Sequence, residues 1–316
     1  MLGLLLALGI ALPAHGTVRT DSLWSQALGV YKHYRVYLPP SYEQDRARRY
    51  PVAYYLHGLH GSERDWVEHG HLDAAMDSLI AAGGPEMIVV MPDGDDGWYT
   101  TWNTLGGYSA CLHDSTLHEP ARDYCVPWLH YDDYIARDLV AHVDSAYRTI
   151  PDRAHRAIAG LSMGGYGAMI LAFEYPEIWS AAASHSGVVS PLYTGPHPFA
   201  PPLRYATDIA QVRAALGHLW PWMRLPFGDD MAAWRSRDPL WRLERLLATR
   251  PSMIPAIFLD VGMDDHLADE NRAFHAELTA RHVQHAYAEW PGSHDWTYWS
   301  AHVGESLAWI GAHIAR

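Results

Sequence analysis

The sequence is short of positive charge. Its 316 residues include 23 Lys and Arg against 36 Asp and Glu, a formal net charge of −13 with histidine taken as neutral. Nucleic acids and anionic membrane surfaces are bound through basic faces, so this balance argues against either as a partner. It sets no such limit on a small neutral substrate. The remaining composition, 49% hydrophobic and 19% charged, is that of a globular protein with a sizeable core.

The chain also lacks an apolar run long enough to cross a membrane. The run that opens it, in MLGLLLALGIALPAHG, has about 14 residues, whereas a spanning helix needs about 20. Small residues follow it, and Ala14 and Gly16 form a plausible cleavage sequence. Residues 1–16 are therefore predicted to be a signal peptide, although no Lys or Arg precedes the apolar part. This interpretation predicts a secreted or periplasmic protein without stable membrane insertion. The alternative is a buried N-terminal helix or strand.

Cysteine is nearly absent, with only Cys111 and Cys125. Two cysteines this close in an exported protein are expected to form a disulfide, although two unrelated thiols remain the alternative. Their spacing is not that of a metal site. We predict neither a metal nor a cofactor.

No internal repeat is visible, and strand-like and helix-like segments alternate instead. The expected strands cover 33–42, 50–58, 87–94, 155–160, 180–190, 253–262 and 285–290. The expected helices cover 65–84, 131–150, 163–176, 269–282 and 300–314. Such alternation predicts an α/β fold with a mostly parallel sheet and helices on both faces. Functional sites in these folds lie at the carboxyl ends of the strands.

One segment does not follow this alternation of strands and helices. Residues 191–250 are rich in Pro, Trp and Arg and are too long for an ordinary connection. We expect a partly helical, lid-like insertion over a site. With this insertion included, residues 17–316 are predicted to form a single domain. Residues 95–130 are expected to be irregular and rich in aromatic side chains.

A G-x-S-x-G sequence follows the strand expected at 155–160. Gly160 and Gly164 flank Ser162 at a distance of two residues on each side. In a tight strand-to-helix elbow, these two positions must lack side chains, and the serine hydroxyl then projects from the top of the sheet. Ser162 is therefore a candidate nucleophile. The alternative, a phosphate-binding loop, would favour glycine in place of this serine.

A serine nucleophile needs a base and a carboxylate that orients the base. His294 follows the last expected strand and precedes the closing helix. Asp264 and Asp265 follow the strand at 253–262, and the order Ser, Asp, His is the one found in α/β-hydrolases. Spacing alone does not separate these two aspartates. Asp260, within the strand, and Asp295, adjacent to the histidine, are weaker rivals.

An oxyanion hole needs two N–H donors. One is expected from Met163, which follows the candidate nucleophile. The other is expected from the turn LHGLHGS, where Gly58 and Gly61 allow a close approach of the backbone and Leu59 is the candidate donor.

Several motifs taken together resemble one family of proteins. They are RVYLPPSY, YPVAYYLHGLHGS, YDDYIARDL, RAIAGLSMGGYGA, SHSG, GMDDHLADENRAFHAEL and GSHDWTYW. Over about residues 30–316 the chain is similar to the esterase D (putative esterase) family of α/β-hydrolases. Feruloyl, acetylxylan and tributyrin esterases, S-formylglutathione hydrolases and mycolyltransferases belong to that family. The resemblance implies Ser162 as nucleophile, His294 as base, Asp265 as its orienting carboxylate, and Leu59 and Met163 as oxyanion donors.

The resemblance also implies an activity. We expect a serine carboxylesterase that acts on a small-molecule or carbohydrate ester, either a short-chain acyl ester or a carbohydrate-linked acetyl or hydroxycinnamoyl ester. An acyltransferase of the mycolyltransferase type is one alternative, because only the acceptor differs. A non-catalytic binding protein on a hydrolase scaffold is another. The chain departs from the family pattern in 108–130 and 191–250, two segments expected to shape the pocket.

Overall fold

The computed structural model describes residues 15–102, 108–115 and 120–315. Of the predicted signal peptide 1–16, residues 1–14 lie outside the described residues. Within the described ranges, no helix has both the length and the apolar character needed to span a membrane.

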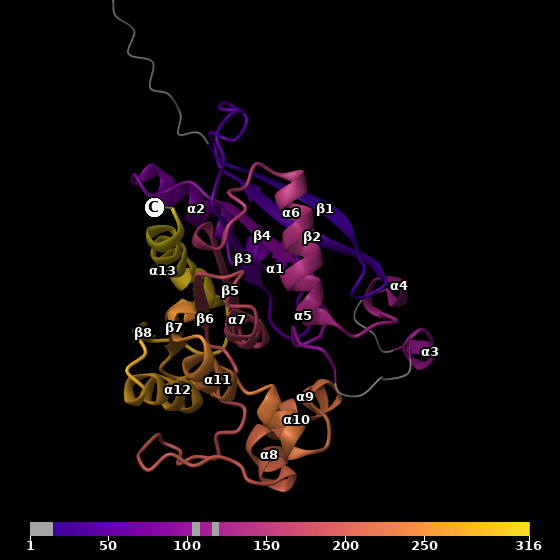
Figure 1. Ribbon diagram of the computed structural model, residues 1–316, viewed down its shortest axis with the longest axis vertical. Helices are drawn as coiled ribbons and strands as arrows, with labels where there is room; N and C mark the ends of the chain where they lie inside the picture. Colours follow the sequence, from indigo (N-terminus) through magenta and orange to yellow (C-terminus); the bar gives the residue numbers. More distant parts are fainter. Residues whose placement is uncertain (1–14, 103–107, 116–119, 316) are drawn as a thin grey trace, which may run out of the picture.

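A twisted eight-stranded sheet forms the centre of the molecule (Figure 1). In chain order its strands are β1 (Thr17–Ser25), β2 (Val30–Leu38), β3 (Val52–Leu56), β4 (Ile88–Pro92), β5 (Arg156–Leu161), β6 (Ala181–His185), β7 (Ala256–Gly262) and β8 (His285–Trp290). Their spatial order is β1-β2-β4-β3-β5-β6-β7-β8. β1 and β2 pair antiparallel, as do β2 and β4, and all other neighbours pair parallel. The predicted mostly parallel sheet is confirmed.

Helices of very different lengths connect the strands. The α-helices are α1 (Asp65–Glu68), α2 (Leu72–Ala81), α3 (Tyr108–Cys111), α4 (Ala121–Tyr124), α5 (Tyr131–Asp133), α6 (Val140–Ala146), α7 (Met163–Glu174), α8 (Ile209–Leu216), α9 (Trp220–Phe227), α10 (Met231–Ser236), α11 (Pro239–Thr249), α12 (Ala268–Ala280) and α13 (Trp296–Ile314). A π-helical stretch, Tyr134–Leu139, joins α5 to α6. The segment 191–250 is partly helical, as expected, and α8, α9 and α10 gather at one end of the molecule (Figure 1).

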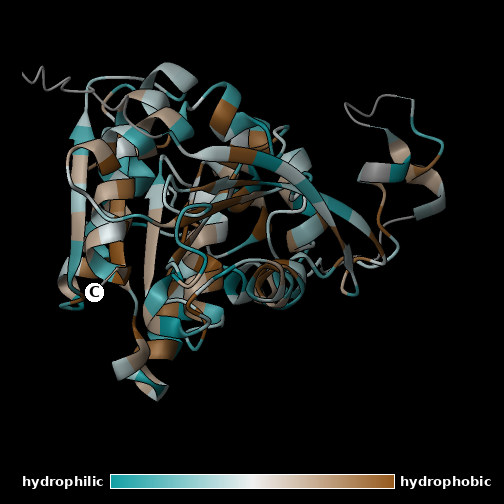
Figure 2. Cartoon of the chain, turned by 90° about the horizontal axis from the view of Figure 1, so that it is seen from above, coloured by the Kyte–Doolittle hydropathy of each residue, from teal (hydrophilic) through white to brown (hydrophobic). Residues whose placement is uncertain are grey.

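The two faces of the sheet bury separate hydrophobic clusters, because alternate side chains of each strand point to opposite faces. In β3, Tyr54 and Leu56 belong to the cluster that packs against α7, whereas Ala53 and Tyr55 belong to the other. α2 and α13 cover that second face. In Figure 2 the strands can be followed from above between these helical layers, with hydrophobic residues in brown.

One strand was not predicted, and one expected helix is wrong. β1 was not expected, because TVRTDSLWS mixes polar and charged residues; it is an edge strand with one mostly exposed face, which needs no apolar pattern. The helix expected over 65–84 is two helices. They are interrupted at His71, whose backbone has a left-handed conformation (φ 50°) that cannot continue a right-handed helix.

The segment 95–130 contains the two one-turn helices α3 and α4, which lie at the periphery of the molecule (Figures 1 and 2). Cys111 at the end of α3 and Cys125 directly after α4 form a disulfide, as expected. Tyr124, next to this disulfide, donates a hydrogen bond to the buried carboxylate of Asp96. Asp96 in turn accepts hydrogen bonds from the backbone and the ring of His60, so the disulfide-containing segment is linked to the loop that follows β3.

Candidate active site

Ser162 lies in a sharp turn between β5 and α7. Its backbone angles, φ 52° and ψ −116°, are strained for a residue with a side chain. Hydrogen bonds on both sides hold the turn: the Ser162 N–H donates to the carbonyl of His185, and the Ser162 carbonyl accepts from the N–H of Tyr166. The serine side chain remains partly accessible at the carboxyl end of the sheet. This is the elbow geometry that the G-x-S-x-G sequence predicts.

Gly160 and Gly164 make this turn possible through close backbone contacts. A Cβ atom on Gly164 would clash with the carbonyl oxygens of Leu56 and His57, and a Cβ atom on Gly160 would clash with the backbone of Gly164. Neither clash could be relieved by a side-chain rotation, because the opposing atoms belong to the backbone.

We therefore expect Gly164→Ala to destabilise the protein by about 1–3 kcal/mol, the usual cost of overpacking, and to lower its activity by displacing the elbow. Thermal or denaturant unfolding measures the first effect. Gly304→Ala is the matched control, since Gly304 lies in helix α13 with open space around it. There alanine is expected to stabilise by about 0.5–1 kcal/mol through helix propensity. Equal effects of the two substitutions would contradict the role given to Gly164.

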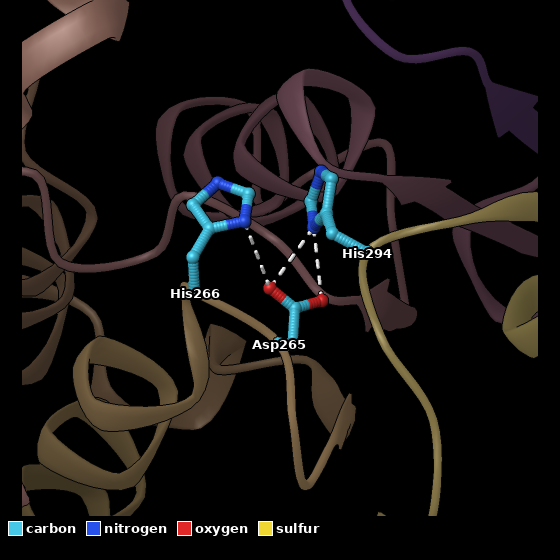
Figure 3. Close-up of side chains that lie close together, drawn as sticks. All are labelled: Asp265, His266 and His294. Carbon is cyan, nitrogen blue, oxygen red and sulfur yellow. Dashed lines mark hydrogen bonds and ion pairs between the residues drawn. The ribbon is translucent and has the colours of Figure 1, made fainter.

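His294 bridges Ser162 and Asp265. Its Nε2 atom lies 2.9 Å from Ser162 Oγ. Its Nδ1 atom lies 2.9 Å from Asp265 Oδ2 and 3.1 Å from Oδ1. Because the carboxylate can only accept, the Nδ1–H donates to it, and Nε2 is left to accept the serine proton. Figure 3 shows the Asp265 carboxylate below the His294 ring. The loops after β5, β7 and β8 thus bring together three residues that are up to 132 positions apart.

The Asp265 side chain is completely buried. Burial by itself would raise the pKa of Asp265, but the bonds from the His294 ring and the Leu267 N–H outweigh it and hold the pKa below its usual range. The carboxylate is therefore ionised at neutral pH and favours a protonated His294 ring when the serine transfers its proton.

The three rival aspartates have other surroundings. Asp264 is exposed, and only its N–H approaches the His294 loop, through a hydrogen bond to the carbonyl of Gly292. Asp260 is buried inside the sheet, 2.6 Å from His185 Nδ1, and accepts a hydrogen bond from Tyr298. Asp295 caps α13 at its N-terminus by accepting from the Tyr298 N–H. Among these aspartates, only Asp265 contacts His294.

A second histidine lies beside this group, and no motif distinguishes it from the other histidines among the chain's 21. His266 Nδ1 is 3.5 Å from Asp265 Oδ1, and the His266 ring packs edge-on against His294 with 4.5 Å between centroids. Asp265, His266 and His294 are close enough to share a metal ion (Figure 3). However, both ring nitrogens of His294 already bond to Ser162 and Asp265, so this histidine offers no spare lone pair.

The two predicted oxyanion donors come from different segments of the chain, α7 and the loop after β3. Met163 is the first residue of α7, and the first N–H groups of a helix have no acceptor within the helix. Leu59 lines the same pocket as Ser162. The neighbouring Gly58 is so close that a Cβ atom on it would lie 3.6 Å from the Ser162 Cβ. Leu59 and Met163 thus both belong to the immediate surroundings of the serine, and they remain the predicted oxyanion donors.

His57, which sequence reasoning missed, orients the Leu59 N–H. The Gly94 N–H can only donate, and it donates to His57 Nε2 at 2.8 Å; the opposite ring nitrogen therefore carries a proton. This Nδ1–H donates to the Gly58 carbonyl at 2.7 Å. The Gly58 carbonyl and the Leu59 N–H belong to one planar peptide unit, so a bond to the first fixes the direction of the second.

A buried ionic cluster lies behind this loop. Lys32, the only lysine in the sequence, is inaccessible to solvent and lies 2.6 Å from both Asp93 Oδ2 and Asp95 Oδ1. Burial opposes the charge of the lysine, but the Asp95 and Asp93 carboxylates outweigh it and raise the pKa of Lys32. Tyr131 also donates to Asp95. The cluster holds the loop after β4, which includes the Gly94 N–H that binds His57.

Lys32→Met is expected to destabilise the fold by about 3–5 kcal/mol, because it removes the lysine charge that the two buried carboxylates share. Urea unfolding would measure the change. The control is Arg19→Met, which breaks the exposed ion pair with Glu43 and is expected to cost less than about 1 kcal/mol. A Lys32→Met protein as stable as the control would show that the cluster contributes nothing.

A pocket of about 300 Å³ opens over Ser162 and His294. Leu59 of the loop after β3 and Trp299 of α13 line it, together with His218, Leu219 and Trp222 from the segment 191–250. A larger hollow, of about 570 Å³, lies where β7 and β8 begin, between Ala256 and His285. That hollow is at the amino ends of the strands, away from the serine, and offers none of the residues described above.

Comparisons with known proteins agree with this architecture. The family model described as "Putative esterase" matches residues 25–310. The acetyl esterase of Caldicellulosiruptor saccharolyticus is 23% identical over 262 residues, 82% of each chain. The endo-1,4-β-xylanase/feruloyl esterase of Xylanibacter ruminicola is 29% identical over 169 residues, which are 52% of this chain. This chain spans only 21% of the length of that relative.

A solved structure of a ferulic acid esterase superposes with a TM-score of 0.69 at 28% identity, covering 95% of this chain and 99% of that one. The predicted α/β-hydrolase fold is confirmed by this similarity and by the strand order described above.

Proposed function

The chain belongs to the Putative esterase family, and from this premise we propose that it is a serine carboxylesterase. One observation carries the proposal: Ser162 Oγ, His294 and the buried Asp265 form a continuous hydrogen-bonded series beside a pocket. Such a series activates a serine hydroxyl for acyl transfer. No step of this chemistry calls for a metal or a cofactor.

In the first half of the reaction, Ser162 Oγ attacks the ester carbonyl carbon while its proton passes to His294 Nε2. The carbonyl oxygen becomes negative and is bound by the N–H groups of Leu59 and Met163. The tetrahedral intermediate then collapses. Its bond to the alcohol oxygen breaks, and that oxygen receives the proton held by His294, leaving an acyl group on the serine.

In the second half, water takes the place of the alcohol. His294 removes a proton from the water as its oxygen attacks the acyl carbon. The bond to Ser162 Oγ then breaks, and the same proton returns to the serine. Asp265 stays ionised throughout and stabilises the histidine cation formed in each half.

We propose that the substrate is a small-molecule or carbohydrate ester, with a short-chain acyl, acetyl or hydroxycinnamoyl group. The relatives described above, an acetyl esterase and two feruloyl or ferulic acid esterases, support this range. We also propose that residues 1–16 are a signal peptide of a secreted or periplasmic protein, and that residues 191–250 form a lid on a single domain covering 17–316. Three pocket residues from that segment support the lid.

Labelling with a fluorophosphonate tests the proposal. We expect one covalent adduct, located on Ser162 by mass spectrometry, together with hydrolysis of a panel of acetyl, butyryl and feruloyl esters. Folded protein that forms no adduct would contradict the proposal. The panel should be repeated with a sugar acceptor, since acyl transfer faster than hydrolysis would replace hydrolysis as the main reaction.

A further inference from the structure

A second pocket of about 240 Å³, lined by both apolar and polar residues, adjoins the one that contains Ser162. The two pockets have four lining residues in common: His218 and Leu219 from the segment 191–250, and His266 and Leu267 from the loop after β7. A substrate that extends past these four residues would therefore reach from the serine into the second pocket.

The arrangement of the histidines indicates which part of an ester would point that way. His294 gives its proton to the departing alcohol oxygen, so the alcohol lies on the His294 side of Ser162. His266 packs against His294 at 4.5 Å between ring centroids and lines both pockets. The second pocket thus lies on the alcohol side of the scissile bond.

The second pocket contains polar groups held in place by α12. Its lining includes Tyr193, His197 and Glu270. Asp269 accepts a hydrogen bond from His197 at 2.9 Å, and the Tyr193 hydroxyl donates to the carbonyl of Pro196. These bonds fix the 193–197 loop against the first turn of α12, so the polar groups face a preformed space.

Glu270 is a partly buried carboxyl group in the lining of this pocket. Its Oε1 atom accepts the N–H of Ser190 at 3.4 Å, and the surface it keeps accessible faces the pocket. Burial raises the pKa of Glu270 to about 8, so at neutral pH the carboxyl group carries a proton. It then offers both an O–H donor and a carbonyl acceptor, which suits a neutral hydroxyl group and does not attract an anion.

We propose that the pocket formed by Tyr193, His197 and Glu270, here called the alcohol pocket, binds the alcohol part of the ester, and that this alcohol is a polyol such as a sugar ring. Glu270 is the residue that selects for it by hydrogen bonding to a hydroxyl group. This inference rests on the proposed esterase function and narrows it to esters whose leaving alcohol has further hydroxyls.

The test compares two esters of one acyl group, chosen as the group hydrolysed fastest in the panel above: the ethyl ester and the monoester of methyl β-D-xylopyranoside. Values of kcat and KM are measured for the wild-type protein, Glu270→Leu, Glu270→Gln and His197→Ala. Glu305→Leu is the control, because Glu305 is an exposed residue of α13 that lines neither pocket.

We expect the wild-type kcat/KM to favour the sugar ester by about tenfold, the contribution of one or two hydrogen bonds. Glu270→Leu should abolish this preference through KM, whereas Glu270→Gln should keep most of it, since an amide also donates and accepts. His197 is 62% exposed, so His197→Ala should fold normally and reduce the preference about threefold. Glu305→Leu should behave as the wild type.

Two results would overturn the inference. One is a wild-type protein with no preference for the sugar ester, which needs no variant to observe. The other is an equal loss on both esters in Glu270→Leu, which would mean that Glu270 only supports the backbone at Ser190. Failure of the proposed function itself is a different result: no fluorophosphonate adduct on Ser162 and no ester hydrolysed.

Discussion

Ser162→Ala is expected to lower kcat for ester hydrolysis by about 10⁶-fold, the loss typical when the nucleophile of such a triad is removed. The substitution takes away only Oγ, so the bond to His294 Nε2 is lost while the backbone bonds of the elbow remain. The fold should stay intact, and the melting temperature should move little. The measurement is hydrolysis of the fastest ester in the panel, with purified variant and wild-type protein at equal concentration.

Labelling supplies the control for this result. The alanine variant should show no fluorophosphonate adduct, while its circular dichroism spectrum matches that of the wild type. If the folded variant kept more than about 1% of the wild-type rate, another residue would have to be the nucleophile. A variant that does not fold would instead point to a structural role for the hydroxyl.

Asp265→Asn is expected to lower kcat by about 10⁴-fold through the histidine tautomer. The Leu267 N–H donates to Asp265 Oδ1, so an asparagine would keep its carbonyl oxygen there and place its NH₂ group where Oδ2 now lies, 2.9 Å from His294 Nδ1. An NH₂ group donates to Nδ1 and moves the ring proton to Nε2. The ring could then no longer accept the proton of Ser162.

Asp264→Asn is the matched control, one residue away with the same chemical change. Its side chain is exposed and its N–H bond to Gly292 does not involve the carboxylate. We expect a rate within about twofold of the wild type, as for most exposed substitutions. A larger loss in Asp264→Asn than in Asp265→Asn would assign the orienting role to Asp264.

Much of the fold is visible in the sequence because its elements carry strong local patterns. The strands β3 to β7 are short, mostly apolar runs, β4 and β7 end in proline and glycine, and α7 begins directly after the elbow serine. β1 escaped detection because an edge strand can be polar on its exposed face. The break before α2 depends on the left-handed backbone of His71, which residue type alone does not predict.

The residues around the site also differ in whether a local sequence pattern predicts them. Ser162 and His294 stand out because a motif or a strand end marks them. The network of His57, Lys32 and Asp93 has no such mark, since a lysine in a strand is ordinarily a surface residue. Only the pairing of β2 with β4 places Lys32 next to two aspartates that follow β4.

The fold class, the elbow at Gly160 to Gly164 and the chain order of the candidate triad can be predicted from the sequence alone, since each depends on local spacing along the chain. Local spacing left Asp264 and Asp265 open and only the family resemblance favoured Asp265; the tertiary structure gives the physical difference, because neighbouring side chains in a loop point in different directions and only Asp265 is buried against His294. Only the tertiary structure shows that Glu270, 108 residues after Ser162 in the sequence, lies in a pocket next to the one that contains Ser162. Which loops meet at the end of a sheet depends on how the strands pair, and that pairing is a property of the whole chain.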